Sequence, residues 1–153
     1  MLKICAVKVP KFINKTEYNN LFLQLSKYKH ENTKKYSNIR DSYRNIIGET
    51  LMIYMYLENG DVLETQFEIS YDCYGKPFIP TNHQIFFNIS HSGDWVICAI
   101  DSFPVGIDIE LVQNIESDNI NHFFSSEEYK QLTKKSSLDK VKYFYELWTL
   151  KES

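Results

Sequence analysis

The sequence predicts an α+β fold in which helices pack on a mostly antiparallel sheet. Residues 38–57 and 137–153 repeat apolar side chains every three or four positions, which is typical of amphipathic helices. Several shorter segments alternate apolar and polar residues, which is typical of strands with one buried face. Short turns join neighbouring strands, and this favours antiparallel pairing.

The N-terminal part is expected to contain one strand and two helices. A strand over residues 2–7 ends before Pro10, and Thr16 can cap a helix over residues 17–28. A polar, basic stretch separates this helix from a longer one, which runs from about residue 38 to residue 57. The buried stripe of the long helix is predicted to be Ile46, Ile47, Thr50, Leu51 and Tyr54.

The middle of the chain is expected to form hairpins. A turn at residues 58–61 and a loop at residues 74–80 carry glycine or proline, and Gly93 is free to take a positive φ in a tight turn. The expected strands are residues 65–70, 85–90, 95–100 and 105–110.

The last third is expected to be helical. A helical region covers about residues 115–124, Ser125 or Ser126 caps a second helix, and a final helix runs from near Ser137 to Ser153. The final helix is still periodic where the chain stops, with neither a glycine nor a C-cap. We therefore expect a truncated chain or a fragment of a longer protein.

Length and composition limit the classes of function. The 153 residues suffice for one domain, or one and a half small ones, and the net charge of −3 lacks the basic excess of a nucleic-acid binder. No segment reads as a signal peptide or a membrane span, so cytoplasm is the expected location. Three cysteines without a CxxC pair fit neither a disulfide framework nor a zinc site, and Cys5 and Cys98 read as small buried hydrophobes.

Asp108 and Glu110 lie on one face of the strand predicted at residues 105–110. Two carboxylates so placed can share a hard divalent cation, and Mg²⁺ combines a few carboxylates with water and phosphate oxygens. A solvated sheet face explains the same pair, and it is the better interpretation of these two residues alone.

The final helix adds a second acidic element. Its apolar stripe, continued by one turn, arrives at Lys151 and Glu152, and burial of this charged pair costs free energy unless it is compensated. A structural ion pair would compensate it, and so would a metal ion with an anionic ligand. If the helix packs against residues 105–110, Glu152 would complete a Mg²⁺ site. The stripe is Val141, Phe144, Tyr145 and Trp148.

Several side chains elsewhere suit a phosphate ligand. Ser90 and His91 stand at a strand-to-turn junction, and Lys76 lies beside the rigid ring of Pro77, which suits the edge of a nucleotide. Each of these is also compatible with an ordinary surface role. A basic cluster in the first half comprises Lys27, Lys29, Lys34, Lys35, Arg40 and Arg44.

The motifs together resemble the Sfp type of 4′-phosphopantetheinyl transferase. The resemblance rests on "YGKPFIP", "FNISHSGDWVICAI", "VGIDIE", "FFSSEEY" and "FYELWTLKES", which occur in the family's order. The pair "GIDIE" and "LWTLKES", about forty residues apart, is the family signature. The resemblance implies transfer of 4′-phosphopantetheine from coenzyme A to a serine of an apo acyl or peptidyl carrier protein, with release of adenosine 3′,5′-bisphosphate.

The resemblance also implies residue roles. Asp108, Glu110 and Glu152 would hold Mg²⁺ against the pyrophosphate of coenzyme A, and Glu152 would act as, or position, the general base. Lys151 would sit beside the phosphates, and it joins Glu152 and His91 as the expected catalytic group. The expected coenzyme A contacts are Lys29, Arg44, Lys76, Pro77, Ser90, His91 and Lys151.

The implied fold has two similar α/β halves with the coenzyme between them. Residues 1–103 would form the first half, and residues 104–153 would begin a second half that is incomplete in this chain. The full-length protein would be a monomer that activates carriers of peptide or polyketide synthesis. The alternative is a non-catalytic fragment that binds coenzyme A or a nucleotide and needs a partner or its missing C-terminal part.

Overall fold

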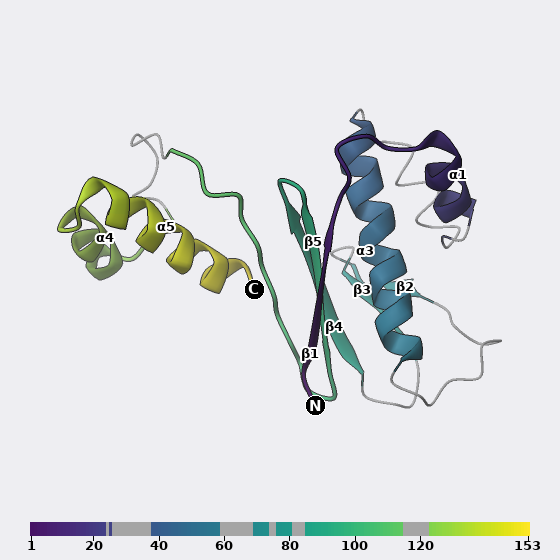
Figure 1. Cartoon of the computed structure of the whole chain (residues 1–153). Coiled ribbons are helices and arrows are strands. Elements are labelled where there is room, and N and C mark those ends of the chain that lie inside the picture. Colours follow the sequence, from purple (N-terminus) through teal and green to yellow (C-terminus); the bar gives the residue numbers. More distant parts are fainter. Residues whose placement is uncertain (24, 26–37, 59–68, 74–75, 81–84, 115–122) are drawn as a thin grey trace.

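The computed structural model describes residues 1–23, 25, 38–58, 69–73, 76–80, 85–114 and 123–153. Its central sheet is antiparallel with strand order β1-β5-β4, and helix α3 covers one face (Figure 1). The α+β prediction is therefore confirmed. The elements in chain order are β1 (Lys3–Lys8), α1 (Lys15–Leu23), α3 (Ile39–Leu57), β2 (Ser70–Tyr71), β3 (Pro77–Phe78), β4 (Phe86–Ser92), β5 (Trp95–Asp101), α4 (Ser126–Thr133) and α5 (Ser137–Glu152).

The core forms between α3 and the central strand β5, which is buried from Val96 to Ile100. Alternation along the strands turns Phe87 of β4 and Cys98 of β5 toward the helix. Burial, with a smaller contribution from Cys5, raises the pKa of the Cys98 thiol to about 12. Cys98 is fully buried, as predicted, whereas Cys5, for which the same was predicted, is only partly buried. The main cluster is Leu51, Met52, Met55, Tyr56, Ile79, Phe87, Cys98 and Ile100.

Helix α3 begins where the Asn38 side chain accepts a hydrogen bond from the backbone N–H of Arg40. Its predicted bounds are confirmed, and Ile46 and Leu51 are buried as expected. Tyr54 is 57% exposed, so its place in the buried stripe was wrongly predicted. In the C-terminal half of α3, the side chains that face the core are those of Met52, Met55 and Tyr56.

Helix α1 begins one residue before the predicted cap. The Asn14 side chain, not Thr16, provides the cap, because its Oδ1 accepts from the backbone N–H of Thr16 at 2.8 Å. Tyr18 Oη and Ser42 Oγ, 2.6 Å apart, connect α1 to α3. The predicted extension of this helix to residue 28 lies almost entirely outside the described residues.

The ribbon of β2 and β3 is a separate antiparallel sheet. Most of the strand predicted at 65–70 lies outside the described residues, and β2 covers only its last residue and Tyr71. The region predicted as a loop at 74–80 contains β3, since Pro77 pairs with Tyr71. Two hydrogen bonds close the ribbon: the Lys76 N–H donates to the side chain of Asp72 at Oδ1, and the Asp72 N–H donates to the Lys76 carbonyl.

The strand predicted at residues 105–110 is wrong. Residues 104–114 form no strand, although this segment runs beside β4 (Figure 1). Its backbone N–H groups donate to side chains of β4 rather than to backbone carbonyls, so no ladder forms. The three pairs are Ile107 to Asn88, Ile109 to Ser90 and Leu111 to Ser92.

The two C-terminal helices are confirmed. Ser125 and Glu128 form a capping box at the start of α4, and Ser136 caps α5. Phe124 and Leu132 are buried between the helices, with Tyr143, Phe144 and Leu147 packed against them. The helical region predicted at 115–124 lies outside the described residues except for its last two, which form a turn. Within the described ranges, no helix has the length and apolar character needed to span a bilayer.

Candidate functional site

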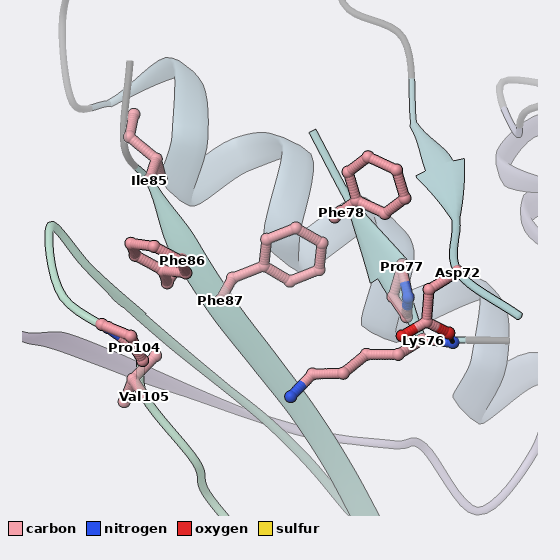
Figure 2. Close-up of a pocket in the computed structure, with 9 residues that line it drawn as sticks. All are labelled: Asp72, Lys76, Pro77, Phe78, Ile85, Phe86, Phe87, Pro104 and Val105. Atoms are coloured by element: carbon pink, nitrogen blue, oxygen red, sulfur yellow. Dashed lines mark hydrogen bonds between the residues drawn. The ribbon is translucent and has the colours of Figure 1, made fainter. Parts of the chain in front are cut away.

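Two adjoining cavities open where α3, the β2–β3 ribbon and β4 meet. The first, about 250 Å³, is largely apolar and extends to Pro104 and Val105 (Figure 2). The second, about 210 Å³, lies against α3. They share Lys76, Pro77 and Phe87, so they form two ends of one groove. The second cavity is lined by Arg44, Asn45, Gly48, Glu49, Lys76, Pro77, Phe87, Asn88, Ile89 and His91.

The groove brings together four of the residues expected to contact the coenzyme. Arg44 comes from α3, Lys76 and Pro77 from the ribbon, and His91 from β4. Figure 2 shows the Lys76 side chain reaching away from Pro77 and toward β4. Three basic side chains around one cavity favour an anionic ligand. Lys29, the other expected contact from the first half, lies outside the described residues.

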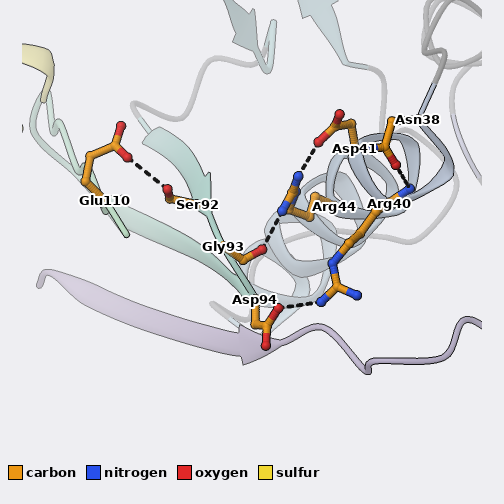
Figure 3. Close-up of polar contacts among 8 residues, drawn as sticks. All are labelled: Asn38, Arg40, Asp41, Arg44, Ser92, Gly93, Asp94 and Glu110. Atoms are coloured by element: carbon orange, nitrogen blue, oxygen red, sulfur yellow. Dashed lines mark hydrogen bonds and ion pairs between the residues drawn. The ribbon is translucent and has the colours of Figure 1, made fainter. Parts of the chain in front are cut away.

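Arg44 also joins α3 to the β4–β5 hairpin. Its guanidinium donates to the Gly93 carbonyl and to the Asp41 carboxylate, and the neighbouring Arg40 pairs with Asp94 (Figure 3). The turn can pass this close because Gly93 takes a φ of +56°, which side chains disfavour. Within the described ranges, no group accepts a hydrogen bond from the buried Nε of Arg44, so the side chain keeps a donor for a ligand.

Ser90 and His91 are adjacent in β4, so their side chains leave opposite faces of the strand. His91 lines the groove, whereas Ser90 turns to the segment that follows β5. Its hydroxyl donates to Asp108 Oδ1 at 2.6 Å and accepts from the N–H of Ile109 at 3.3 Å. The two neighbours thus contribute to different sides of the site.

Asp108 and Glu110 lie side by side along this segment. The Ser92 hydroxyl donates to Glu110 Oε2 at 2.8 Å (Figure 3). The Ser90 hydroxyl donates to Asp108 in the same way. Asp108 Oδ2 is buried, and no described residue donates a hydrogen bond to it. A buried, unpartnered carboxylate oxygen is costly unless a cation meets it, so this atom fits a metal ion.

The end of α5 approaches the same segment. A Cβ added to Gly106 would lie 2.3 Å from the backbone carbonyl carbon of Ser153, so the helix end and residue 106 are in direct contact. Lys151 and Glu152 are exposed there, which corrects their predicted place on the packed side of the helix. Lys151 Nζ pairs with Glu128 Oε2 at 3.0 Å. A structural ion pair was one of the two arrangements considered for the charged end of this helix, and a metal ion with an anionic ligand was the other.

The structure does not gather the three expected metal ligands, Asp108, Glu110 and Glu152, into one site among the described residues. Among the described residues, no group of three His, Cys, Asp or Glu side chains is placed to hold a metal ion. The backbone contact between Gly106 and Ser153 nevertheless brings the residue after Glu152 to the segment that holds Asp108.

Sequence reasoning missed three side chains of this region. Glu49 is only 3% exposed, lines the groove, and accepts a hydrogen bond from Tyr71 Oη at 3.3 Å. It occupies a buried position three residues after Ile46, and this spacing was the available signal. Asn88 and Ser92 extend the polar alternation of Ser90 along β4, which was also visible in the sequence.

The groove is lined by three basic side chains and lies beside two carboxylates that accept hydrogen bonds from serines. This arrangement suits a protein that binds an anionic ligand. The carboxylates come from the segment after β5, and the cations come from α3, the ribbon and β4.

Comparison with known proteins identifies the family. Residues 13–103 match the model described as "4'-phosphopantetheinyl transferase, N-terminal", and residues 104–153 match the "4'-phosphopantetheinyl transferase superfamily". The chain is 39% identical over 153 residues to 4'-phosphopantetheinyl transferase gsp of Aneurinibacillus migulanus. It is 35% identical over 152 residues to 4'-phosphopantetheinyl transferase Sfp of Bacillus subtilis.

The chain belongs to the 4′-phosphopantetheinyl transferase superfamily. The alignments cover 100% and 99% of this chain, but only 64% of the length of gsp and 68% of that of Sfp. The chain therefore spans about two thirds of these relatives. A more distant relative, HetI of a Nostoc strain, is 29% identical over 130 residues.

Proposed function

We propose that this protein transfers 4′-phosphopantetheine from coenzyme A to a serine of an apo acyl or peptidyl carrier protein, with Mg²⁺. Family membership supports the transferase class. The single observation that carries the metal part is the buried Asp108 Oδ2, which has no hydrogen-bond partner in the part of the chain that the structure describes and is the atom that a cation would meet.

The groove residues provide charge neutralisation for a phosphate ester. Arg44, Lys76 and His91 would bind the phosphates of coenzyme A, and Pro77 would flank the adenine. On the opposite face of β4, Ser90 would contribute by orienting Asp108. Phosphoryl transfer depends mainly on positioning and on stabilising the charge that develops, so these side chains suit the reaction.

The carboxylates Asp108, Glu110 and Glu152 would hold Mg²⁺. The bound ion would neutralise the pyrophosphate and orient it for attack. Glu152 would act as, or position, the general base that takes the proton of the carrier serine. Lys151 would add positive charge beside the phosphates, after it exchanges its present partner Glu128 for the ligand.

Mass spectrometry of the carrier tests this proposal. The chain is incubated with coenzyme A, Mg²⁺ and an apo peptidyl carrier protein, and the carrier is expected to gain the mass of phosphopantetheine. Asp108→Asn keeps the shape of the side chain but removes the charge that would face the cation, so we expect a loss of at least about a hundredfold in transfer rate. Asp101→Asn, the same change at the far end of β5, serves as the control.

Retention of full activity by Asp108→Asn would contradict the metal assignment. Activity that persists when a chelator replaces Mg²⁺ would contradict the need for a divalent cation. Both results would leave the coenzyme groove to be judged separately, by calorimetric titration of coenzyme A into Arg44→Ala and Lys76→Ala variants.

The second candidate is a module that binds coenzyme A or a nucleotide without catalysis. It is favoured by the exposure of Lys151 and Glu152 and by the pairing of Lys151 with Glu128 instead of the groove. Calorimetric binding of coenzyme A by the wild-type chain, together with no mass gain on the carrier, would support this candidate over the transferase.

A further inference from the structure

The polar face of β4 meets the acidic segment in three regularly spaced contacts. Asn88 Oδ1 accepts from the N–H of Ile107 at 2.8 Å. Two residues later in both segments, Ser90 meets Asp108 and Ile109, and two residues later again, Ser92 meets Glu110 and Leu111. Side chains here take the place that backbone carbonyls have in a sheet.

Each serine bridges two successive residues of the segment. Ser90 donates to the carboxylate of Asp108 and accepts from the next N–H, that of Ile109. Ser92 repeats the pattern with Glu110 at 2.8 Å and the N–H of Leu111 at 3.0 Å. A hydroxyl has one proton to donate, so both its donor and an acceptor position are committed in this arrangement.

The first contact differs because residue 106 is glycine. Asn88 accepts the N–H of Ile107, but the preceding position carries no side chain to meet. The end of α5 uses that space, since a Cβ on Gly106 would lie 2.4 Å from the Ser153 carbonyl oxygen. The two-residue spacing of these contacts therefore leaves room for the end of α5 at Gly106, and it orients the carboxylates of Asp108 and Glu110.

We propose that Asn88, Ser90 and Ser92 are positioning residues that set the register of residues 107–111 and thereby aim Asp108 and Glu110 at the cation. Ser92 acts on Glu110 and Ser90 acts on Asp108. The part concerning the cation rests on the proposed function. The register does not, because it depends on hydrogen bonds within the chain alone.

Ser92→Ala is the sharpest test because Ser92 lies outside the residues proposed to touch the coenzyme. Amide hydrogen exchange, followed residue by residue by NMR, should quicken at Leu111 by roughly fivefold or more, while Ile109 keeps its wild-type rate. The affinity for Mn²⁺, used as a paramagnetic substitute for Mg²⁺ and followed by electron paramagnetic resonance, should fall about 10–100-fold. Ser92→Thr, which restores the hydroxyl, should recover most of both losses.

Ser102→Ala provides the matched control. Ser102 also donates its hydroxyl to a carboxylate, Asp101 Oδ1 at 3.2 Å, but it lies outside the β4 contacts. Neither the exchange at Leu111 nor the affinity for Mn²⁺ should change in this variant.

The two claims fail in different ways. Unchanged exchange at Leu111 in Ser92→Ala would overturn the register proposal, whatever the metal does. Faster exchange with Mn²⁺ affinity within twofold of the wild type would overturn the role in aiming Glu110. If the wild-type chain binds no Mn²⁺, the metal part of the proposed function fails, while the exchange at Leu111 still decides the register.

Discussion

Gly106 lies where the end of α5 meets the segment that carries Asp108 and Glu110. The space for a side chain is already occupied there, because an added Cβ would lie 2.3 Å and 2.4 Å from backbone atoms of Ser153. These are backbone atoms rather than the far end of a flexible side chain, so the end of α5 would have to shift to make room. The glycine is therefore required for space.

Gly106→Ala should displace the end of α5 and reduce the free energy of unfolding by about 1–3 kcal/mol, the usual cost of overpacking. Urea unfolding followed by circular dichroism measures this change. Gly48→Ala is the comparison: its Cβ would meet Cγ2 of the Ile89 side chain at 2.9 Å, which is a side-chain atom rather than backbone, and alanine favours the helix by about 1 kcal/mol, which offsets part of the cost. Gly106→Ala proving no more costly than Gly48→Ala would contradict this account.

Glu49 is a buried acidic residue that connects the core to the groove. It is a carboxylate at 3% exposure in α3, and its bond to Tyr71 Oη connects the helix to the β2–β3 ribbon that carries Lys76. A buried charged group is retained only where it is hydrogen-bonded or paired. Its place in the wall of the groove shows how one side chain connects the core to the site.

Helices α4 and α5 are joined at Glu128. Its carboxylate accepts the backbone N–H of Ser125, which completes the capping box, and also pairs with Lys151 from the end of α5. The backbone hydrogen bond of Ser125, followed by the bond from Lys151, holds the pKa of Glu128 below its usual value. The ionised form therefore stabilises the folded helix pair.

Glu128→Gln tests this contribution through pH. Because the folded pKa is lowered, the stabilisation is present above the ordinary glutamate value of 4.5 and is lost as the pH falls through the folded value. The variant should melt lower than wild type near pH 7, and the difference should shrink at about pH 3. Glutamine still serves the capping box, so the change isolates the charge.

Glu127→Gln, at the exposed neighbouring position, is the control for this experiment. It should melt like the wild type at both pH values. A melting difference between wild type and Glu128→Gln that stays constant across the pH range would show that the charge of Glu128 does not act as described.

The buried apolar side chains of the described residues form two centres. One lies between α3 and the sheet, where two adjoining clusters share Ile89, and the other lies between α4 and α5 around Leu132. The two tryptophans report on them separately: Trp95 is in β5, and Trp148 packs against Phe144 in α5. The helical centre has only two buried residues among those described, so we expect it to be the weaker one.

Leu132→Ala should destabilise the helical centre by about 2–5 kcal/mol, because it removes a fully buried side chain. Urea unfolding is followed by fluorescence in Trp95→Phe and Trp148→Phe backgrounds, so that each retains one reporter. The transition reported by Trp148 should shift to lower urea, while that reported by Trp95 stays in place. Transitions that move together would show that the two centres unfold as one unit.

The sequence by itself determined most of the local structure. The periodicity of residues 38–57 and 137–153 predicted α3 and α5, and Ser125 was identified as one of two possible caps of α4. Alternation predicted β1, β4 and β5 within a few residues. These features depend on contacts between residues near one another in the chain, and such contacts leave a periodic signal.

Only the tertiary structure decided how the site is assembled. It showed that residues 105–110 form no strand, because polar side chains of β4 receive their N–H groups. It separated Ser90 from His91 by strand geometry, and it showed that Glu152 is exposed. Alternation shows which residues share a face, but not what that face meets, since the partners come from distant parts of the chain.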